Sequence, residues 1–155
     1  MICCGFGYRV MLMDVEKPLR EVLERLVKEQ GVTVFYTGGM GEFDELFART
    51  VRGMKRNDPR LRLVLVLPYL TRQAATEKAW YESHYDEILI PAELDGVHSK
   101  AAITRRNRWM VDRSDFILAA LHRDYGGAFQ AIRYATSIGK PVITCIHEKV
   151  DYNMA

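Results

Sequence analysis

Several features that would mark a specialised class of protein are missing from this 155-residue sequence. No apolar run approaches the ~20 residues that a membrane-spanning helix needs. The opening stretch MICCGFG lacks the basic segment of a secretory signal peptide. No segment is compositionally biased, and the net charge is only +2, so the totals give no support to a nucleic acid or a membrane as partner. We therefore expect an ordinary globular protein of the cytoplasm.

Cysteine is also scarce, with three residues in the chain. Cys3 and Cys4 are adjacent, and Cys145 lies far away, so the three cannot all form disulfides. There is no CxxC motif and no His/Cys cluster at metal-ligand spacing, so no metal site is predicted. The scattered histidines have no Ser/Asp or Cys partner that would indicate a catalytic triad. We expect reduced cysteines buried inside strands.

What the chain does contain is a regular alternation of short apolar runs and amphipathic segments. The apolar runs predict strands, at Ile2–Phe6, Val32–Tyr36, Leu61–Leu67, Phe116–Leu121 and Gly139–Ile146, with a shorter one at Glu87–Ile90. Residues at helical spacing predict helices, at Glu16–Gln30, Glu42–Lys55, Ala74–Glu82, Lys100–Arg113 and Gly127–Ile138. The segment Ala92–Ser99 is predicted to be a loop.

This alternation predicts an α/β fold: a single Rossmann-like, doubly wound sheet, mostly parallel, of about five main strands with helices on both faces. The domain is expected to span residues 1–146, and residues 147–155 are expected to form a frayed C-terminal tail.

Three glycine-bearing loops follow strands of this predicted sheet, at Gly5–Arg9, Thr37–Glu42 and His122–Gly127. In doubly wound sheets, ligands bind beyond the carboxyl ends of the strands, where such loops converge. The glycines that we assign to this binding site are Gly5, Gly7, Gly38, Gly39, Gly41, Gly126 and Gly127.

The stretch FYTGGMGEFDEL (Phe35–Leu46) has the form of a phosphate cradle, because glycines precede the start of a helix. It matches neither G-x-G-x-x-G nor the P-loop motif. Glu42, Asp44 and Glu45 lie in the first turn of the predicted helix. They either complement the helix dipole or include a carboxylate that accepts hydrogen bonds from ribose hydroxyls. Asp44 is our candidate for the ribose contact.

The other two loops are better suited to phosphate. Arg9 can form a charge-assisted contact with a phosphate, and Tyr8 can stack on a base or cap the sheet. Gly126 and Gly127 precede a helix with no acidic residue in its first turn. The arginines of ITRRNRWMVDR are expected to divide between solvent and cleft, with Arg106 as the candidate for the cleft.

Four stretches taken together resemble the SLOG superfamily, and in particular its small YpsA-like proteins from bacteria and phages. They are CCGFGYR, FYTGGMGEFDELFARTV, RNRWMVDRSDFILA and YGGAFQAIRYATSIGKPVI, and they cover nearly all of residues 1–146. The resemblance implies a Rossmann-like fold that binds nucleotides or nucleotide-derived ligands. Relatives include the LOG phosphoribohydrolases, which split nucleoside monophosphates, and the DNA-uptake protein DprA.

The similarity to LOG enzymes can be followed along the chain. Those enzymes have an arginine four residues before a methionine, then a Ser/Ala-Asp strand, as do Arg106, Met110 and Ser114-Asp115 here. Arg106 therefore matches their catalytic arginine. GGMGEFDE also fits the LOG pattern G-G-x-G-x-x-x-E and ends on Glu45, but it follows the second strand, whereas the LOG motif follows the fourth.

The sequence departs from the LOG pattern where that motif, P-G-G-x-G-T-x-x-E, should stand. Gly126 and Gly127 are retained, while the third glycine, the threonine and the catalytic glutamate are replaced by Phe129, Gln130 and Arg133. The YpsA-like opening usually has a histidine where this chain has Tyr8, which favours stacking over acid–base chemistry there.

We therefore expect a sensor-like domain that binds a nucleotide or an ADP-ribose-like ligand, with no required cofactor and without strong intrinsic catalysis. The first alternative is a nucleoside 5′-monophosphate phosphoribohydrolase, an N-glycosidic hydrolase that would use Arg106 with Glu42 or Glu45. The second alternative is a single-stranded nucleic-acid binder, which the modest net charge disfavours. By analogy with LOG proteins, a homodimer is expected.

Overall fold

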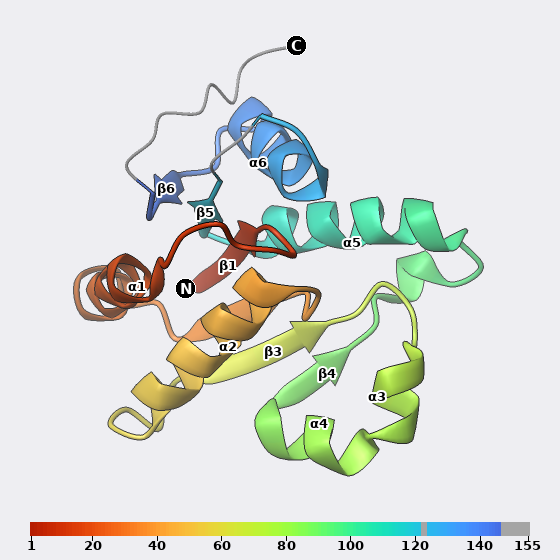
Figure 1. The fold of residues 1–155 in the computed structure, drawn as a ribbon, viewed down its shortest axis with the longest axis horizontal. Helices are drawn as coiled ribbons and strands as arrows, with labels where there is room; N and C mark the ends of the chain where they lie inside the picture. The colour runs from red at the N-terminus through yellow and green to blue at the C-terminus, as the bar shows by residue number, and fades with distance from the viewer. Residues whose placement is uncertain (122–123, 147–155) are drawn as a thin grey trace.

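The structure, a computed structural model, describes residues 1–121 and 124–146. Its centre is one sheet of six strands, all parallel, in the order β4-β3-β2-β1-β5-β6 (Figure 1). The strands are β1 (Ile2–Gly7), β2 (Val34–Thr37), β3 (Arg62–Val66), β4 (Glu87–Leu89), β5 (Phe116–Ala120) and β6 (Val142–Thr144). The predicted α/β doubly wound fold is confirmed.

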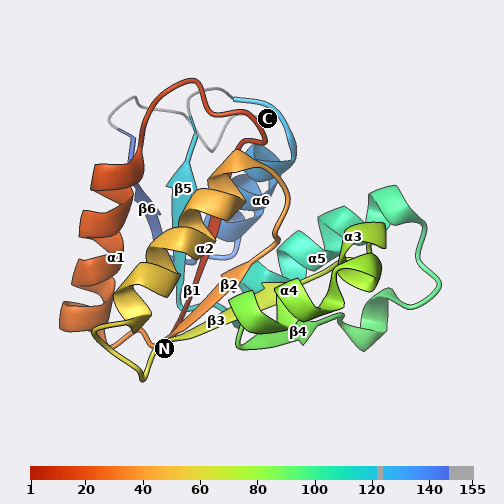
Figure 2. The same cartoon turned by 60° about the horizontal axis from the view of Figure 1, so that its bottom comes forward.

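Helices cover both faces of this sheet (Figure 2). On one face lie α1 (Glu16–Gln30), α2 (Glu42–Lys55), α3 (Arg72–Thr76) and α4 (Lys78–His84), and on the other lie α5 (Ser99–Arg113) and α6 (Gly127–Ser137). A short 3-10 turn, η1 (Ala92–Leu94), precedes α5.

Alternation along the strands explains why both faces are covered. Cys3 of β1 packs into the cluster that includes α1 and α2, whereas the next residue, Cys4, packs into the cluster that includes α5 and α6. Leu63 and Val64 of β3 divide in the same way. Because successive side chains of a strand point to opposite faces, a nearly continuous apolar strand must be covered on both sides.

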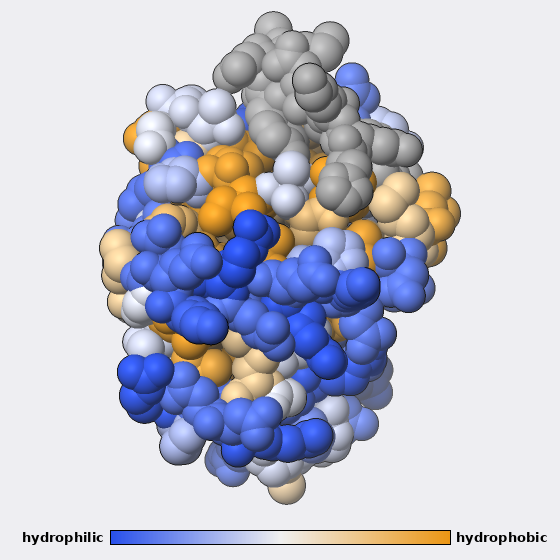
Figure 3. Space-filling view, turned by 90° about the vertical axis from the view of Figure 1, so that its left-hand side faces the viewer, coloured by the Kyte–Doolittle hydropathy of each residue, from blue (hydrophilic) through white to orange (hydrophobic). Residues whose placement is uncertain are grey.

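The helix α1 shows how its sequence sets its limits and its buried face. Leu19, Val22, Leu23 and Leu26 are buried at helical spacing, and Gly31 ends the helix in the left-handed conformation, with φ of 72°. The side of the molecule where α1 lies in Figure 1 faces the viewer in Figure 3, and most of that surface is hydrophilic. Among the described residues, no helix combines the length and the apolar character needed to cross a bilayer.

The structure corrects several predicted boundaries. The six strands are the five main strands and the shorter one that the sequence predicts, and their pairing, predicted to be mostly parallel, is entirely parallel. The predicted helix Ala74–Glu82 is two short helices, with a break at Glu77, where the backbone leaves the helical conformation. The predicted loop Ala92–Ser99 contains η1. Cys145 lies just beyond β6, outside a strand, although it is buried.

The order of the strands determines where a ligand site can form. The chain runs outward from β1 through β2 and β3 to β4, and then returns to place β5 on the other side of β1. The topological switch point is therefore between β1 and β5, and ligands of open α/β sheets bind at the carboxyl ends of the strands beside it. His122, at the start of the third predicted loop, and the predicted tail at 147–155 lie outside the described residues.

Candidate functional site

A cleft of about 370 Å³ lies at the carboxyl edge of the sheet, next to the switch point. Its walls come from the loop after β1, the loop and first turn of α2, the helix α5 and the start of α6. The predicted site residues that line it are Gly7, Tyr8, Arg9, Asp44, Arg106, Gly126 and Gly127. The lining residues that the sequence analysis missed are Phe6, Val10, Met40, Ile103, Asn107 and Ala128.

The start of α6 is the open part of this cleft. Gly126 precedes the helix with φ of 99°, a conformation that favours glycine, and no side chain caps the helix. Among the described residues, no acceptor is found for the N–H groups of Gly127 and Ala128. A Cβ added at Gly127 would meet open space. Free N–H groups and the positive end of the helix dipole favour an anion at this point.

The start of α2 is occupied by the protein itself. The N–H of Glu42 donates to the carbonyl of Arg9 at 2.9 Å. The N–H of Phe43 donates to the carbonyl of Tyr8 at 3.3 Å. The Glu42 carboxylate in turn accepts the N–H of Met11 at 2.8 Å. These bonds fix the loop after β1 against α2 and leave this helix start unsuited to a phosphate.

The remaining predicted glycines make room for protein atoms. A Cβ at Gly5 would lie 2.7 Å from the Phe47 ring, and one at Gly41 would lie 2.5 Å from the Cα of Arg9. At Gly39, with φ of 66°, it would meet Leu65 at 2.5 Å. Gly5, Gly38, Gly39 and Gly41 do not line the cleft. The close approach that we predicted for a ligand at Gly38, Gly39 and Gly41 is made by the protein's own side chains and backbone.

Arg106 is buried, with 3% of its surface exposed, and it connects α5 to the ends of two strands. Its Nη1 donates to the carbonyls of Gly38 at 3.1 Å and Val66 at 2.8 Å, and its Nε donates to Asn107 Oδ1 at 2.9 Å. Gly38 has no side chain to obstruct this contact, since an added Cβ would lie 2.9 Å from the Arg106 Cζ. Burial lowers the pKa of Arg106 to about 10, so the guanidinium stays charged at neutral pH.

Asp44 faces the same cleft from the first turn of α2. Its Oδ2 accepts the N–H of Met40 at 2.9 Å, which holds the glycine loop in place. Burial raises the pKa of the Asp44 carboxyl to about 6, although the Met40 N–H, Arg106 and Arg9 all act to lower it. The carboxylate is therefore mostly ionised at neutral pH, and it lies where a ligand hydroxyl could donate to it.

The predicted catalytic pair is not brought together. Arg106 lines the cleft, whereas Glu42 and Glu45 line a neighbouring cavity of about 570 Å³. Arg9 borders both cavities.

Most of the residues that line that neighbouring cavity were not predicted from the sequence. Its other walls include Arg52, Gln73 and the aromatic residues Trp80, Tyr81 and Tyr85. The stretch WYESHY, with aromatic residues four apart, was the signal that could have indicated it.

The cysteines are poorly suited to chemistry. All three are free and buried. Burial raises the pKa of Cys4 to about 12 and that of Cys145 to about 11, so both remain thiols at neutral pH. Within residues 1–121 and 124–146, no group of three or more His, Cys, Asp or Glu side chains could hold a metal ion.

Comparison with known proteins supports the fold more strongly than the function. No protein-family model matches the chain. The chain is 26% identical over 139 residues to the uncharacterized SPbeta prophage-derived protein YoqJ of Bacillus subtilis (strain 168), which covers 80% of this chain and 81% of that protein.

Two solved structures of DNA processing protein A, DprA, share the fold. The Streptococcus pneumoniae protein matches with a TM-score of 0.72 and 15% identity, over 97% of this chain and 52% of its own. This chain therefore spans about half the length of that protein. The Helicobacter pylori protein, whose structure describes a single-stranded DNA binding mode, matches with a TM-score of 0.69 and 17% identity. The match covers 97% of this chain and 67% of that protein. The chain thus has a DprA-like, Rossmann-type fold, while membership of the YpsA-like branch of SLOG stays a prediction.

Proposed function

We propose that this protein binds a phosphate-bearing nucleotide, or a ligand derived from one, in the cleft beside the switch point. The observation that carries the proposal is the open start of α6, which lies in the same cleft as Arg9. An exposed helix N-terminus combined with an arginine provides both dipole and charge for a phosphate. The place is also the one at which doubly wound sheets bind nucleotides.

Several of the predicted residues then take a definite part. The N–H groups at Gly127 and Ala128 and the guanidinium of Arg9 contact the phosphate. Asp44 accepts a hydrogen bond from the ribose. Arg106 acts mainly as support, because its Nη1 and Nε already donate to protein acceptors. Tyr8 is buried and forms part of the wall.

Hydrolysis of the N-glycosidic bond receives less support from the geometry. Arg106 and the two candidate glutamates line different cavities, so no carboxylate of that pair lies opposite the arginine. The hydrolase hypothesis predicts release of free base from a nucleoside 5′-monophosphate, lost in Arg106→Ala. Absence of release at high enzyme concentration would contradict it.

The second candidate function is binding of single-stranded nucleic acid, and the DprA-like fold is the observation that favours it. The sequence analysis disfavoured nucleic acid because the net charge is only +2. Net charge says little about a local surface, however, and phosphate contacts depend on where the arginines gather. A homodimer and a cytoplasmic location remain predictions.

A thermal-shift panel of mono-, di- and triphosphates, cyclic nucleotides, NAD and ADP-ribose tests the proposal. A ligand at a hundredfold excess over its dissociation constant should stabilise the fold by ~2.7 kcal/mol. Arg9→Ala should remove most of that stabilisation. The control Arg105→Ala removes an exposed arginine of α5 that does not line the cleft, so the stabilisation by the ligand should be unchanged. A panel in which no compound raises the melting temperature would overturn the proposal.

A further inference from the structure

A groove runs between α2 and α4, on the helical face that carries α1. It consists of the cavity of about 570 Å³ described above and a second one of about 700 Å³, which meet at Arg52 and Tyr85. The first reaches Gly41, at the start of α2, and the second reaches Arg56, just after its end. The groove therefore follows the whole of α2, about 21 Å at 1.5 Å per residue. We call it the α2–α4 groove.

The α2 wall of this groove is cationic toward the end of the helix, whereas Glu42 and Glu45 lie near its start. Arg49, Arg52 and Arg56 follow one another at intervals of three and four residues, so they share one side of the helix. Arg52 donates to the carbonyl of His84 at 3.3 Å and lies over the Tyr85 ring, 5.6 Å from its centre. Arg49 and Arg56 are exposed.

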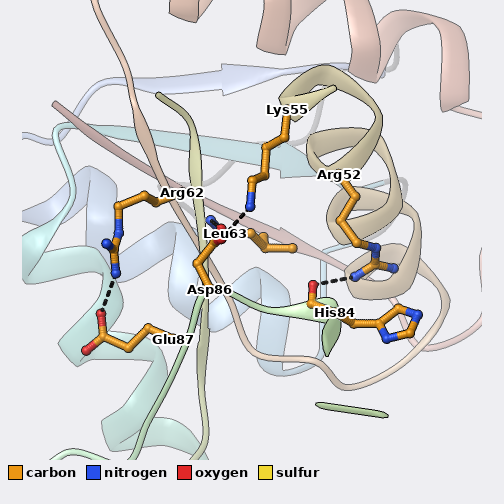
Figure 4. Close-up of polar contacts among 7 residues, drawn as sticks. All are labelled: Arg52, Lys55, Arg62, Leu63, His84, Asp86 and Glu87. Carbon is orange, nitrogen blue, oxygen red and sulfur yellow. Dashed lines mark hydrogen bonds and ion pairs between the residues drawn. The ribbon is translucent and has the colours of Figure 1, made fainter. Parts of the chain in front are cut away.

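The floor of the groove is neutralised by its own contacts. Lys55 pairs with Asp86, whose Oδ2 also accepts the N–H of Leu63 at 2.7 Å (Figure 4). Figure 4 also shows Arg52 directed from α2 toward His84. Arg52, Lys55 and Asp86 line the cavity of about 700 Å³, which we call the lower half of the groove, and the cavity of about 570 Å³ is the upper half. The other carboxylate of the lower half, Glu82, lies 3.8 Å from Lys78, so the unpaired charge there is carried by the arginines of α2.

The α4 wall is aromatic. The Trp80 and His84 rings are stacked, with centres 3.9 Å apart and planes 15° apart, and Tyr81 and Tyr85 are stacked at 6.1 Å and 20°. Trp80 is nevertheless 47% exposed. A stacked and half-exposed indole is a surface on which another flat ring can continue the stack.

The distribution of charge indicates which kind of ligand fits. The lower half has four cationic side chains, Arg49, Arg52, Lys55 and Arg56, against two carboxylates. The upper half has Glu42, Glu45 and Glu77 against Arg9 and Arg52. Phosphates are therefore suited to the half that contains Arg49, Arg52 and Arg56, and uncharged rings to the aromatic α4 wall. A single strand of nucleic acid presents phosphates on one side and bases on the other.

We propose that the α2–α4 groove binds single-stranded nucleic acid, with Arg49, Arg52 and Arg56 contacting phosphates and Trp80 stacking on a base. The inference rests on the second candidate function and assigns it to a surface other than the cleft. Arg9 borders both the groove and the cleft, so the two proposed sites adjoin one another.

Fluorescence anisotropy with a labelled 12-nucleotide oligo(dT) tests the assignment. Trp80→Ala should weaken binding roughly 5- to 150-fold, the range for loss of one stacked base, whereas Trp80→Phe should retain most of it. Arg49→Glu/Arg56→Glu should weaken binding and reduce the slope of log affinity against log salt by about 1.4, because two phosphate contacts are lost. The charge-matched control Arg25→Glu/Arg105→Glu, on α1 and α5, should keep the wild-type slope.

Trp80 also gives a direct signal. The chain has two tryptophans, so Trp109→Phe leaves Trp80 as the single indole. Oligo(dT) should quench its fluorescence, and the quenching should titrate with the same midpoint as the anisotropy. Poly-glutamate of equal charge should neither quench it nor compete at matched concentration.

Failure of this inference is distinguishable from failure of the cleft proposal. Groove variants should leave the nucleotide-induced thermal shift unchanged, and Arg9→Ala should remove that shift whether or not the oligonucleotide binds. The inference is overturned if wild-type protein does not bind oligo(dT), if Trp80→Ala and Arg49→Glu/Arg56→Glu bind as well as wild type, or if poly-glutamate or a duplex of equal length binds equally tightly.

Discussion

The helices α2 and α6 begin in the same way and end up with opposite surroundings. Gly41 and Gly126 precede them with φ of 103° and 99°, and neither helix start has a side-chain cap. At α2, the first N–H groups donate to carbonyls of the loop after β1. At α6, they face the cleft. The glycines before the two helices thus have nearly the same backbone conformation, but one helix start has a structural role and the other is suited to a ligand.

The difference comes from tertiary neighbours. The loop after β1 passes over the start of α2, where Arg9 and Tyr8 supply backbone acceptors. Acidic side chains then occupy the first turn of α2, and Glu42 completes the arrangement by accepting the Met11 N–H. A glycine before a helix therefore indicates a phosphate site only where no other part of the chain has taken the N–H groups.

The largest expected effect is on stability, from Gly41→Ala. The backbone there has φ of 103°, and the new Cβ would lie 2.5 Å from the Arg9 Cα, so strain adds to a clash with backbone. We expect the free energy of unfolding to fall by about 4 kcal/mol, measured by urea denaturation followed by circular dichroism.

Two glycine variants calibrate this loss. Gly126→Ala has the same unfavourable φ, but its nearest neighbour is the Tyr8 ring at 3.9 Å, so a loss of about 1–3 kcal/mol is expected. Gly53→Ala lies in the interior of α2 with nothing within 4 Å and should stabilise by up to about 1 kcal/mol. Equal losses at Gly41 and Gly126 would remove the contrast between the two helix starts.

Arg106→Ala is expected to cost about 3 kcal/mol of stability, because the buried carbonyls of Gly38 and Val66 lose their donor. Urea denaturation measures the loss. Arg105→Ala, one residue earlier on the exposed side of α5, is the control and should change stability by less than about 0.5 kcal/mol. An Arg106→Ala variant as stable as wild type would show that the arginine is kept for a ligand and not for the fold.

Asp44 gives the fold a specific dependence on pH. Its pKa of about 6 in the folded protein exceeds the ordinary 3.8, so the folded state favours the protonated carboxyl. Its contribution to stability is therefore fully present below pH 4 and is lost as pH rises through 6. The free energy of unfolding of Asp44→Asn, relative to that of wild type, should therefore increase by up to about 2 kcal/mol from pH 4 to pH 8. This figure allows for the partial exposure of Asp44.

Denaturation midpoints at several pH values measure that difference. The matched control is Glu45→Gln, which removes one negative charge from an exposed position of the same turn. A difference between Asp44→Asn and wild type that is flat from pH 4 to 8 would contradict the raised pKa.

The smallest expected change in stability tests the comparison most directly. Gly127→Glu gives α6 an acidic first residue, as Glu42 gives α2. The carboxylate complements the helix dipole, so stability should rise by roughly 0.3–1 kcal/mol. Binding of any phosphate ligand should nevertheless fall at least tenfold, which titration calorimetry with the best compound of the thermal-shift panel measures. Gln130→Glu, one turn further along α6, serves as the charge-matched control.

Much of the fold could be predicted because it depends on local pattern. The apolar runs at β3 and β5 and the spacing of Leu19, Leu23 and Leu26 in α1 gave strands and helices close to those observed. The break at Glu77 was missed because nothing in the local sequence of ATEKAW interrupts helical propensity. The short strand β4 was predicted one residue too long, at Glu87–Ile90 instead of Glu87–Leu89.

The site was harder to predict because its geometry depends on contacts between distant residues. The glycine pattern identified the loops, and seven of the predicted residues line the cleft. No local pattern indicated that Gly38 would contact Arg106, 68 positions away, or that Glu42 would accept the Met11 N–H, 31 positions away. The groove was missed because its two walls come from α2 and α4, and each alone is an ordinary surface helix.

The central position of β1 has a consequence for folding. Ile2 and Asp115, 113 positions apart, are joined by two hydrogen bonds where β1 meets β5. The Asp115 N–H donates to the Ile2 carbonyl at 2.7 Å, and the Ile2 N–H donates to Asp115 Oδ2 at 2.8 Å. During synthesis, β1 can pair with β2 early, but its other edge stays open until β5, at Phe116–Ala120, has left the ribosome. Long-range parallel pairing of this kind is slow, and the unpaired edge of β1 stays exposed until the pairing is complete.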